Sequence, residues 1–446
     1  MLRPLLLLIT CLSAPLISRA EPPRPNVVFI ISDDQAWSDY GFMGHAEIKT
    51  PHLDKLSRES LVFKRGYVPS SLCCPSLSSV LTGRYPHQTK ITGNEPPRPV
   101  APKGEKARSP YLNPVFAAQV KELTGFMEKQ PRLPVELGKV DYISLQTGKW
   151  WAGNFSTGGF TEGMSKGDIE HGGRHGDEGL DIGRKTMEPI YDFITRAKAK
   201  QKPFFLWYAP MLPHQPHDPP QRLLDKYRDK TPSLHVAKYW ANCELFDETC
   251  GALLKNLEDQ GVAQNTIVIY LADNGWIQDP TKPKFRIDSK LSQYDGGLRT
   301  PIMIRWPGKV EAKMSDIPVS TVDIAPTIYK ALELPLPEGQ PGLNLLDEKA
   351  IKERDSAFGA CFLHNAVDIH EPAKNLTYRW CVVGDWKLIL PKPENITQAN
   401  RDGREVGEVE LYNITKDPTE EKNLAKDTPD KVAELTKKID AWWAAK

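Results

Sequence analysis

The chain has 446 residues, of which 40% are hydrophobic and 26% are charged, and it carries 11 tryptophans. This composition supplies enough apolar surface for a sizeable core, which excludes a chain that is disordered as a whole. The 58 basic and 57 acidic residues leave a net charge of +1, so the charge gives no support to nucleic-acid or membrane-surface binding.

The N-terminal residues differ from the rest of the chain. Arg3 precedes the apolar run Leu5–Leu8, and Ser18-Arg19-Ala20 places small residues at the two positions that a signal peptidase reads. This pattern predicts a secretory signal peptide over residues 1–20 and an exported protein: periplasmic or secreted, or lysosomal if a eukaryote makes it. No later apolar run is long enough to span a bilayer, so we expect no association with a membrane.

Apolar, β-branched strands alternate with amphipathic helices after the signal peptide. This alternation predicts an α/β fold with a parallel or mixed sheet covered by helices on both faces. The predicted strands are Asn26–Ser32, Tyr142–Leu145, Pro203–Tyr208, Thr266–Leu271 and Pro301–Trp306. The predicted helices include Pro51–Glu59, Pro75–Leu81, Gly183–Lys198, Val236–Asp259 and Ile324–Ala331.

The pattern changes near Asp347. Trp380–Leu390 and Glu408–Ile414 are typical of strands in an antiparallel sheet, and Pro429–Ala445 is typical of an amphipathic terminal helix. We therefore expect a main α/β domain over residues 21–346 and a small α+β subdomain over residues 347–446.

Six cysteines follow the predicted signal peptide, too few for a disulfide scaffold. Cys243 and Cys250 lie two helical turns apart, about 10 Å along the axis, which is too far for a disulfide. Cys361 and Cys381 could pair in an oxidising compartment, and the sequence leaves that pairing open.

Polar residues cluster just after three of the predicted strands. Asp33-Asp34 follows the first strand, Asp273-Asn274 follows another, and the run Pro213–His217 comes shortly after a third. In such sheets, ligands bind beyond the carboxyl ends of the strands. Adjacent carboxylates repel each other unless a cation neutralises them, and an all-oxygen set suits Ca²⁺ or Mg²⁺ rather than Zn²⁺.

The segment Ser70–Arg84 forms a fourth cluster, SSLCCPSLSSVLTGR. Pro75 suits the first turn of a helix, so Cys73 is expected just before that helix, where backbone N–H groups favour an anion or a nucleophile. An inert buried thiol is the alternative interpretation of Cys73 taken alone.

Together these segments resemble those of the type I, formylglycine-dependent sulfatase family of the alkaline phosphatase superfamily. Cys73-Cys74-Pro75-Ser76-Leu77 followed by Thr82-Gly83-Arg84 resembles its C-x-P-S-R motif and the T-G-R that comes after it. Other similar segments, in chain order, are Asp33-Asp34, Gly148-Lys149-Trp150, Pro213-His214-Gln215-Pro216, Asp273-Asn274-Gly275 and Lys290 with Tyr294-Asp295-Gly296-Gly297. The similarity runs in order from about Asn26 to Leu424.

The resemblance implies an alkaline-phosphatase-like α/β fold, with a mixed, mainly parallel sheet sandwiched by helices. It likewise implies a sulfuric ester hydrolase that releases sulfate, with a sulfated carbohydrate as the expected substrate. It also implies one Ca²⁺ ion and the conversion of Cys73 to formylglycine by a formylglycine-generating enzyme. The residues implied to bind the ion are Asp33, Asp34, Asp273, Asn274 and the modified Cys73. The residues implied to surround the sulfate ester are Lys149, His214 and Lys290.

Two residues depart from the family pattern. Leu77 stands where the family has Arg, and Trp151 stands where it has His, so each removes a donor or a positive charge from the expected site. His217, Arg174 and His175 are candidates to replace that charge. Because the metal set, both lysines and His214 are present, an active enzyme with an altered site is favoured.

Two further functions remain open. One is a phosphodiesterase or phosphonate hydrolase of the same superfamily, although its di-zinc members use more histidine ligands than His214 and His217 supply. The other is a non-catalytic protein that binds sulfated glycans, which the changes at Leu77 and Trp151 motivate.

Overall fold

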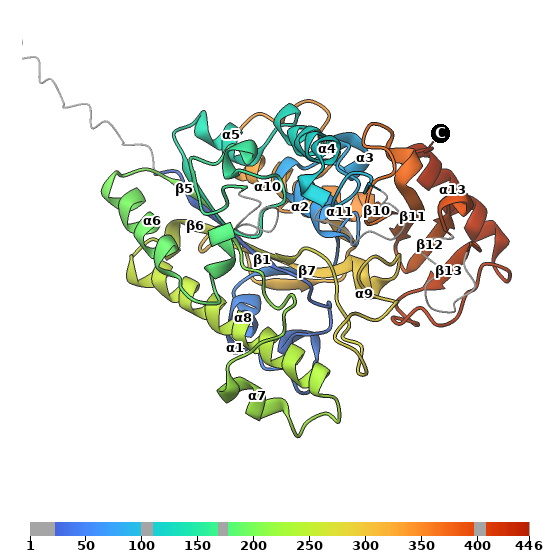
Figure 1. Cartoon of the computed structure of the whole chain (residues 1–446), viewed down its shortest axis with the longest axis horizontal. Coiled ribbons are helices and arrows are strands. Elements are labelled where there is room, and N and C mark those ends of the chain that lie inside the picture. The colour runs from blue at the N-terminus through green and yellow to red at the C-terminus, as the bar shows by residue number, and fades with distance from the viewer. Residues whose placement is uncertain (1–22, 100–109, 168–176, 397–406, 446) are drawn as a thin grey trace, which may run out of the picture.

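The computed structural model describes residues 23–99, 110–167, 177–396 and 407–445, so the predicted signal peptide lies outside the described residues. Within them, a 9-stranded sheet forms the centre of the main body, and a 4-stranded sheet lies at the C-terminal end (Figure 1). The alkaline-phosphatase-like α/β fold with a C-terminal antiparallel subdomain is confirmed. Among the described helices, none combines the length and apolar character needed to cross a bilayer.

The parallel part of the large sheet is buried on both faces. Its strands are β1 (Asn26–Ser32), β3 (Ile143–Gly148), β4 (Glu162–Gly163), β5 (Phe204–Ala209) and β6 (Thr266–Ala272), in the spatial order β4-β3-β5-β1-β6. Alternate residues of β1 enter different cores: Phe29 packs with one set of helices and Ile30 with the other. This two-sided burial explains why these strands are continuous apolar runs.

The rest of the large sheet is mixed. Strand β7 (Arg299–Arg305) runs antiparallel to β6 and to β2 (Leu61–Tyr67). The short strands β8 (Lys313–Ser315) and β9 (Val319–Ser320) pair in parallel with β2. All five predicted strands are present, whereas β2 was not predicted.

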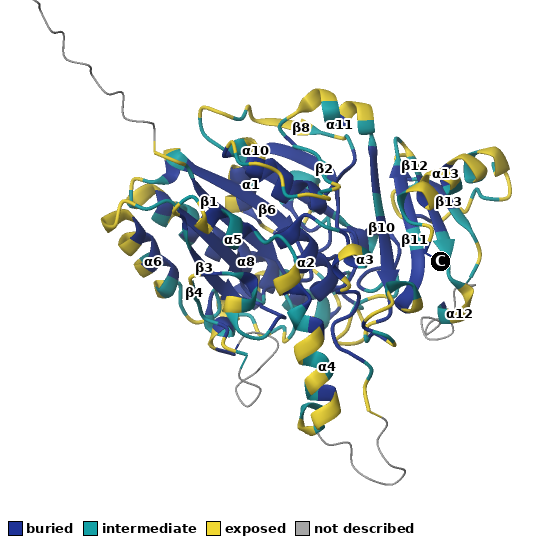
Figure 2. Ribbon diagram, turned by 90° about the horizontal axis from the view of Figure 1, so that it is seen from above, coloured by how far each residue is buried: buried dark blue, intermediate teal, exposed yellow. Residues whose placement is uncertain are grey.

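Helices cover both faces of the sheet (Figure 2). One face packs against α1 (Pro51–Arg58), α6 (Glu188–Ala199) and α8 (Leu234–Asp259), with α7 (Gln221–Tyr227) beyond α8. The other face packs against α2 (Cys73–Thr82), α4 (Pro114–Gly125), α5 (Leu133–Gly138), α10 (Ile324–Ala331) and α11 (Glu348–Arg354). The short helices α3 (Pro86–Thr89), α9 (Asp295–Leu298) and α12 (Pro393–Ile396) lie in the connections.

The start of α6 corrects one prediction. The sequence predicted a helix from Gly183, but the helix begins at Glu188. Gly183 has a φ of +73° and its N–H donates to the Thr186 carbonyl at 3.0 Å, so a tight turn occupies these residues instead.

The C-terminal sheet is antiparallel throughout. It contains β10 (Ser356–Phe362), β11 (Leu376–Val383), β12 (Trp386–Pro391) and β13 (Glu410–Asn413), and helix α13 (Pro429–Trp442) packs on it. The predicted strand Trp380–Leu390 is wrong as a single strand, because Gly384, with a φ of +52°, turns the chain between β11 and β12. The division of the chain at residue 347 stays a prediction.

Among the described residues, Cys73, Cys243, Cys250, Cys361 and Cys381 form no disulfide. Cys361 belongs to the cluster between the C-terminal sheet and the main body, whereas Cys381 belongs to the cluster beneath α13. The two thiols therefore lie on opposite faces of the C-terminal sheet, which excludes a disulfide between them.

A buried charge cluster joins the two sheets. The ammonium group of Lys387 on β12 lies 2.8 Å from a carboxylate oxygen of Asp295 and 2.7 Å from one of Glu420, and these three side chains are at most 1% exposed. Asp295 is the first residue of α9, in the main body. Burial raises the pKa of Glu420 to about 7, even though Lys387 lowers it.

Candidate active site

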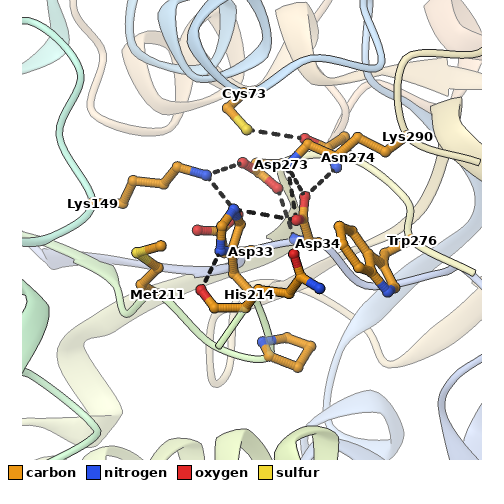
Figure 3. A network of polar contacts seen from close by, with 12 residues as sticks. Asp33, Asp34, Cys73, Lys149, Met211, His214, Asp273, Asn274, Trp276 and Lys290 are labelled. Carbon is orange, nitrogen blue, oxygen red and sulfur yellow. Dashed lines mark hydrogen bonds and ion pairs between the residues drawn. The ribbon is translucent and has the colours of Figure 1, made fainter. Parts of the chain in front are cut away.

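Three strand ends bring the predicted metal ligands and Lys149 to one edge of the large sheet (Figure 3). Asp33 and Asp34 follow β1, Asp273 and Asn274 follow β6, and Lys149 follows β3. Parallel strands have their carboxyl ends at the same edge, so these side chains meet although 240 residues separate Asp34 from Asn274. Residues predicted from strand ends alone thus form one cluster.

Cys73 faces this cluster from the first residue of α2, rather than from the residue before the helix as the sequence predicted. Its sulfur lies 3.5 Å from the Asn274 side-chain oxygen. Ligand atoms of Cys73, Asp33 and Asp34 all lie within 4.8 Å of one another. Burial raises the pKa of the Cys73 thiol, so an unmodified Cys73 stays protonated near neutral pH and is a weak nucleophile.

Two lysines neutralise part of the buried acid. Lys149 Nζ lies 2.6 Å from Asp33 Oδ1 and 3.4 Å from Asp273 Oδ2. Lys290 Nζ lies 2.6 and 2.7 Å from the two oxygens of Asp34. Burial opposes ionisation of Asp34, but Lys290, His214 and Lys149 together outweigh it and hold the Asp34 pKa below its usual range.

The cluster contains more carboxylates than ammonium groups. Asp33, Asp34 and Asp273 face the two ammonium groups of Lys149 and Lys290, and burial, followed by repulsion from Asp33, raises the pKa of Asp273 to about 7. Oδ2 of Asp33 is buried without a hydrogen-bond partner. Such an oxygen-rich, unbalanced set fits a divalent hard cation.

His214 approaches the cluster from the loop after β5. Its Nε2 lies 3.4 Å from Asp34 Oδ2, and its Nδ1 lies 2.7 Å from the Gln215 carbonyl oxygen. Burial lowers the pKa of His214 to about 3, with the neighbouring lysines acting in the same direction. At 17% exposure the His214 side chain is more accessible than Lys149 at 4% or Lys290 at 9%.

Comparisons with known proteins identify the family. The family model described as Sulfatase matches residues 25–334, which is more than half of the chain. The chain belongs to the sulfatase family, whose members are sulfuric ester hydrolases. A second model, described as N-sulphoglucosamine sulphohydrolase, C-terminal, matches residues 285–443.

Curated relatives of this sulfatase-family chain carry names of sugar sulfatases. It is 27% identical to the N-acetylgalactosamine-6-sulfatase of Canis lupus familiaris over 76% of the chain and 69% of the relative. It is 24% identical to the N-acetylgalactosamine-6-O-sulfatase of Bacteroides thetaiotaomicron over 94% of the chain and 93% of the relative.

Solved structures share the fold at low identity. One, determined in complex with k-i-k-neocarrahexaose, has a TM-score of 0.72 and 20% identity, covering 95% of this chain and 94% of its own. The phosphonate monoester hydrolase of Agrobacterium radiobacter has a TM-score of 0.65 and 15% identity, covering 94% of this chain and 96% of its own. The family and fold predicted from the sequence are therefore confirmed.

The two departures from the sulfatase pattern are both buried. Leu77 is 1% exposed and Trp151 is 4% exposed, and both belong to the larger core cluster of the main body. Trp151 packs on Trp150 with ring centroids 4.5 Å apart, and its indole N–H is buried without a partner among the described residues. A role for Trp151 in shaping the substrate pocket stays a prediction.

His217 does not supply the positive charge that was expected to replace the charge lost at Leu77 and Trp151. Burial lowers the pKa of His217 to about 4, so its ring, packed against Tyr239 and Trp276, is neutral near pH 7. Arg174 and His175 lie outside the described residues.

Sequence reasoning missed two neighbours of the site. Trp276 stacks near the Lys290 ammonium, 5.7 Å from the ring centroid, and its position two residues after Asn274 was a usable signal. Arg184, whose guanidinium binds the His214 carbonyl, carried no signal because its segment was predicted as helix.

Proposed function

We propose that this chain is an exported, Ca²⁺-dependent sulfatase that releases sulfate from a sulfated carbohydrate. The observation that carries the proposal is the meeting of Cys73 with Asp33, Asp34 and the two lysines at one edge of the sheet. The sugar sulfatase names of the relatives support the substrate class. The predicted signal peptide supports export, and a mature N-terminus at Glu21 would test it.

The donor set suits the two groups that the family implies. Asp33, Asp34, Asp273 and Asn274 would hold Ca²⁺ together with Cys73 in its formylglycine form. When bound, the ion supplies positive charge at the sulfuryl oxygens, and the hydrated aldehyde supplies the nucleophile that a buried thiol does not. Three carboxylates, two ammonium groups and one divalent ion sum to +1, which complements the single negative charge of a sulfate monoester.

Three side chains of the chain have separate roles around the sulfate ester. Lys149 and Lys290 stay charged, since nearby carboxylates outweigh burial and raise the pKa of each, so their ammonium groups can bind the sulfuryl oxygens. We assign the leaving-group oxygen to His214 because it is the most exposed of the three. Its Nδ1 donates to the Gln215 carbonyl, so Nε2 would take up the proton that it delivers once the anionic ester is bound.

A screen of sulfated mono- and oligosaccharides, with sulfate release as the readout, tests the function. The protein is made together with a formylglycine-generating enzyme, and the peptide spanning Ser70–Arg84 is examined by mass spectrometry. We expect loss of the Cys73 thiol with Cys74 intact, accompanied by sulfate release. Sulfate release from protein with both thiols intact would overturn the assignment of Cys73, and an unmodified protein that binds sulfated glycans without turnover would favour the non-catalytic function.

Paired aryl sulfate and aryl phosphate substrates separate the sulfatase from a phosphodiesterase or phosphonate hydrolase. We expect turnover of the sulfate ester to exceed that of the phosphate ester. The reverse order of rates would overturn the proposal.

Metal removal tests the ion. We expect chelation to abolish turnover and Ca²⁺ to restore it, with elemental analysis giving one Ca²⁺ per chain. Asp273→Ala should lose both the ion and turnover, whereas Asp259→Ala, 58% exposed at the end of α8, should keep both. Full activity after exhaustive chelation, or a bound pair of Zn²⁺ ions, would contradict this assignment.

A further inference from the structure

Arg184 lies outside the cluster of charges but binds the loop that carries His214. The Arg184 side chain is 17% exposed. Its Nη2 donates to the carbonyl oxygens of Met211 at 2.7 Å and His214 at 2.8 Å, and its Nε donates to Met211 at 3.1 Å. A longer contact of 3.4 Å reaches the Pro216 carbonyl. One guanidinium thus gathers three carbonyl oxygens of a single loop.

Few hydrogen bonds within the loop hold it in place. Its described contacts with other segments include the Asp33 N–H to the Leu212 carbonyl at 2.9 Å and the Gln215 side-chain amide to the Pro283 carbonyl. Pro213 and Pro216 flank His214 and Gln215, and neither proline has an N–H to donate to a neighbouring carbonyl. The planar, always charged guanidinium supplies five N–H groups in a fixed fork, which suits several carbonyls at once. On the far side of the loop, Asn242 of α8 makes only long contacts, 3.4 Å to the Pro213 carbonyl and 3.5 Å to that of Pro216.

Arg184 is itself fixed by the turn that precedes α6. Gly183 has a φ of +73°, and a Cβ there would lie 2.8 Å from the Tyr208 hydroxyl and 3.0 Å from the Pro210 Cβ. This close approach sets the turn against the end of β5, directly beside Met211. The opposite end of the guanidinium pairs with Asp218 at 2.5 Å, where Asp218 is 63% exposed.

We propose that Arg184 is a positioning residue that orients His214 toward the leaving-group oxygen of the substrate. In the described contacts, Arg184 touches neither the buried carboxylates of the site nor Cys73. It acts through the backbone carbonyl of His214. This inference rests on the role proposed above for His214. A misplacement of about 1 Å at a reacting group can cost about a hundredfold in rate. Loss of the Arg184 hydrogen bonds to the loop should therefore weaken the assistance that His214 gives to the leaving group.

The test compares substrates with good and poor leaving groups. For Arg184→Gln we expect kcat to fall about ten- to hundredfold on an alkyl or sugar sulfate and by less than about threefold on an aryl sulfate, which needs little protonation of the departing oxygen. The double variant Arg184→Gln/His214→Ala should be no slower than His214→Ala alone. Arg222→Gln is the matched control, because Arg222 lies on α7, pairs with Glu248 and is 58% exposed; it should behave as the unmodified chain.

A second variant and a second readout guard against simple misfolding. Arg184→Lys keeps the charge but lacks the fork, so we expect an intermediate loss with the same dependence on the leaving group. Hydrogen exchange should rise in the peptide containing Met211–Asp218 and stay unchanged in peptides of β6. Equal losses on both substrates, additive losses in the double variant, or unchanged exchange in the loop would overturn the inference. A protein that releases sulfate from no substrate would instead overturn the proposed function.

Discussion

Each active-site lysine is held by a buried carboxylate, and this pairing decides what either residue can do. Lys290 contacts both oxygens of Asp34 and also lies over the Trp276 ring. In the proposed site, a charge in that position would act on the sulfuryl group, which every substrate shares, rather than on the alcohol, which differs between substrates.

We therefore predict that Lys290→Met loses about a hundredfold or more in kcat, by a similar factor on aryl and alkyl sulfates. Steady-state rates on the two substrate types measure this. Lys284→Met, an exposed lysine of the preceding loop, is the control and should leave both rates unchanged. A loss confined to alkyl sulfates would mean that Lys290, not His214, serves the leaving group.

Leu77 gives a second prediction at the scale of one side chain. Because Leu77 is 1% exposed in an apolar cluster, Leu77→Arg must bury a guanidinium, and we expect it to lower the free energy of unfolding by at least about 3 kcal/mol. Leu77→Met, of similar volume, should cost less than about 1.5 kcal/mol. Chemical denaturation measures both. A stable and more active Leu77→Arg variant would show that an arginine still reaches the site from this position.

At the scale of elements, helix α13 packs against a half-buried histidine of α3. The His87 ring of α3 stacks on Trp443 with centroids 4.5 Å apart and lies between it and Tyr85. Burial lowers the pKa of His87 from 6.5 to about 4. The unfolded chain therefore binds a proton first as the pH falls, so His87 favours folding above pH 6.5 and loses that contribution between pH 6.5 and about 4.

We predict that the fall in the free energy of unfolding between pH 7 and pH 4 is up to about 3 kcal/mol smaller for His87→Phe than for the unmodified chain. Phenylalanine keeps the stacking but cannot titrate. Denaturant midpoints at the two pH values measure the difference. His235→Phe, in α8, is the control. Parallel losses in His87→Phe and the unmodified chain would mean that the ring is accessible to protons when folded.

The strands that could be predicted from the sequence are those whose residue pattern follows from burial on both faces of the sheet. Strands β1, β5 and β6 are continuous apolar runs. Strands β1 and β6 lead directly into polar residues of the site, and β5 leads through a short loop to His214. Strand β2, LVFKRGY, escaped prediction because Arg65 is buried at 6% exposure and binds the Asp316 carbonyl, a distant contact that no local pattern indicates. Arg184 was missed because its segment was predicted as helix and its partners lie about 30 residues away.

At the scale of the whole molecule, the two sheets are joined through Lys387. Removing one partner of a fully buried ion pair leaves the others uncompensated, which costs about 3–5 kcal/mol. We predict that Lys387→Met destabilises the chain by that amount and that adding Asp295→Asn and Glu420→Gln recovers much of it. Equilibrium unfolding measures this, with Lys313→Met as the control because Lys313 pairs with Glu348 at the surface. A triple variant no more stable than Lys387→Met would show that the cluster's hydrogen bonds, rather than its charges, hold the sheets together.

The segment from Lys290 to Asp295 touches both the site and the junction, because Lys290 binds Asp34 and Asp295 binds Lys387. This adjacency constrains any chimaera built to change specificity by exchanging the C-terminal half with that of a relative. A crossover at residue 347 separates Asp295 from Lys387 and Glu420, and the hybrid then inherits mismatched charges in a dry interface. A crossover ahead of Lys290 transfers all three together. Recombination between members of this family should therefore succeed more often at the earlier point, even though it cuts into the main domain.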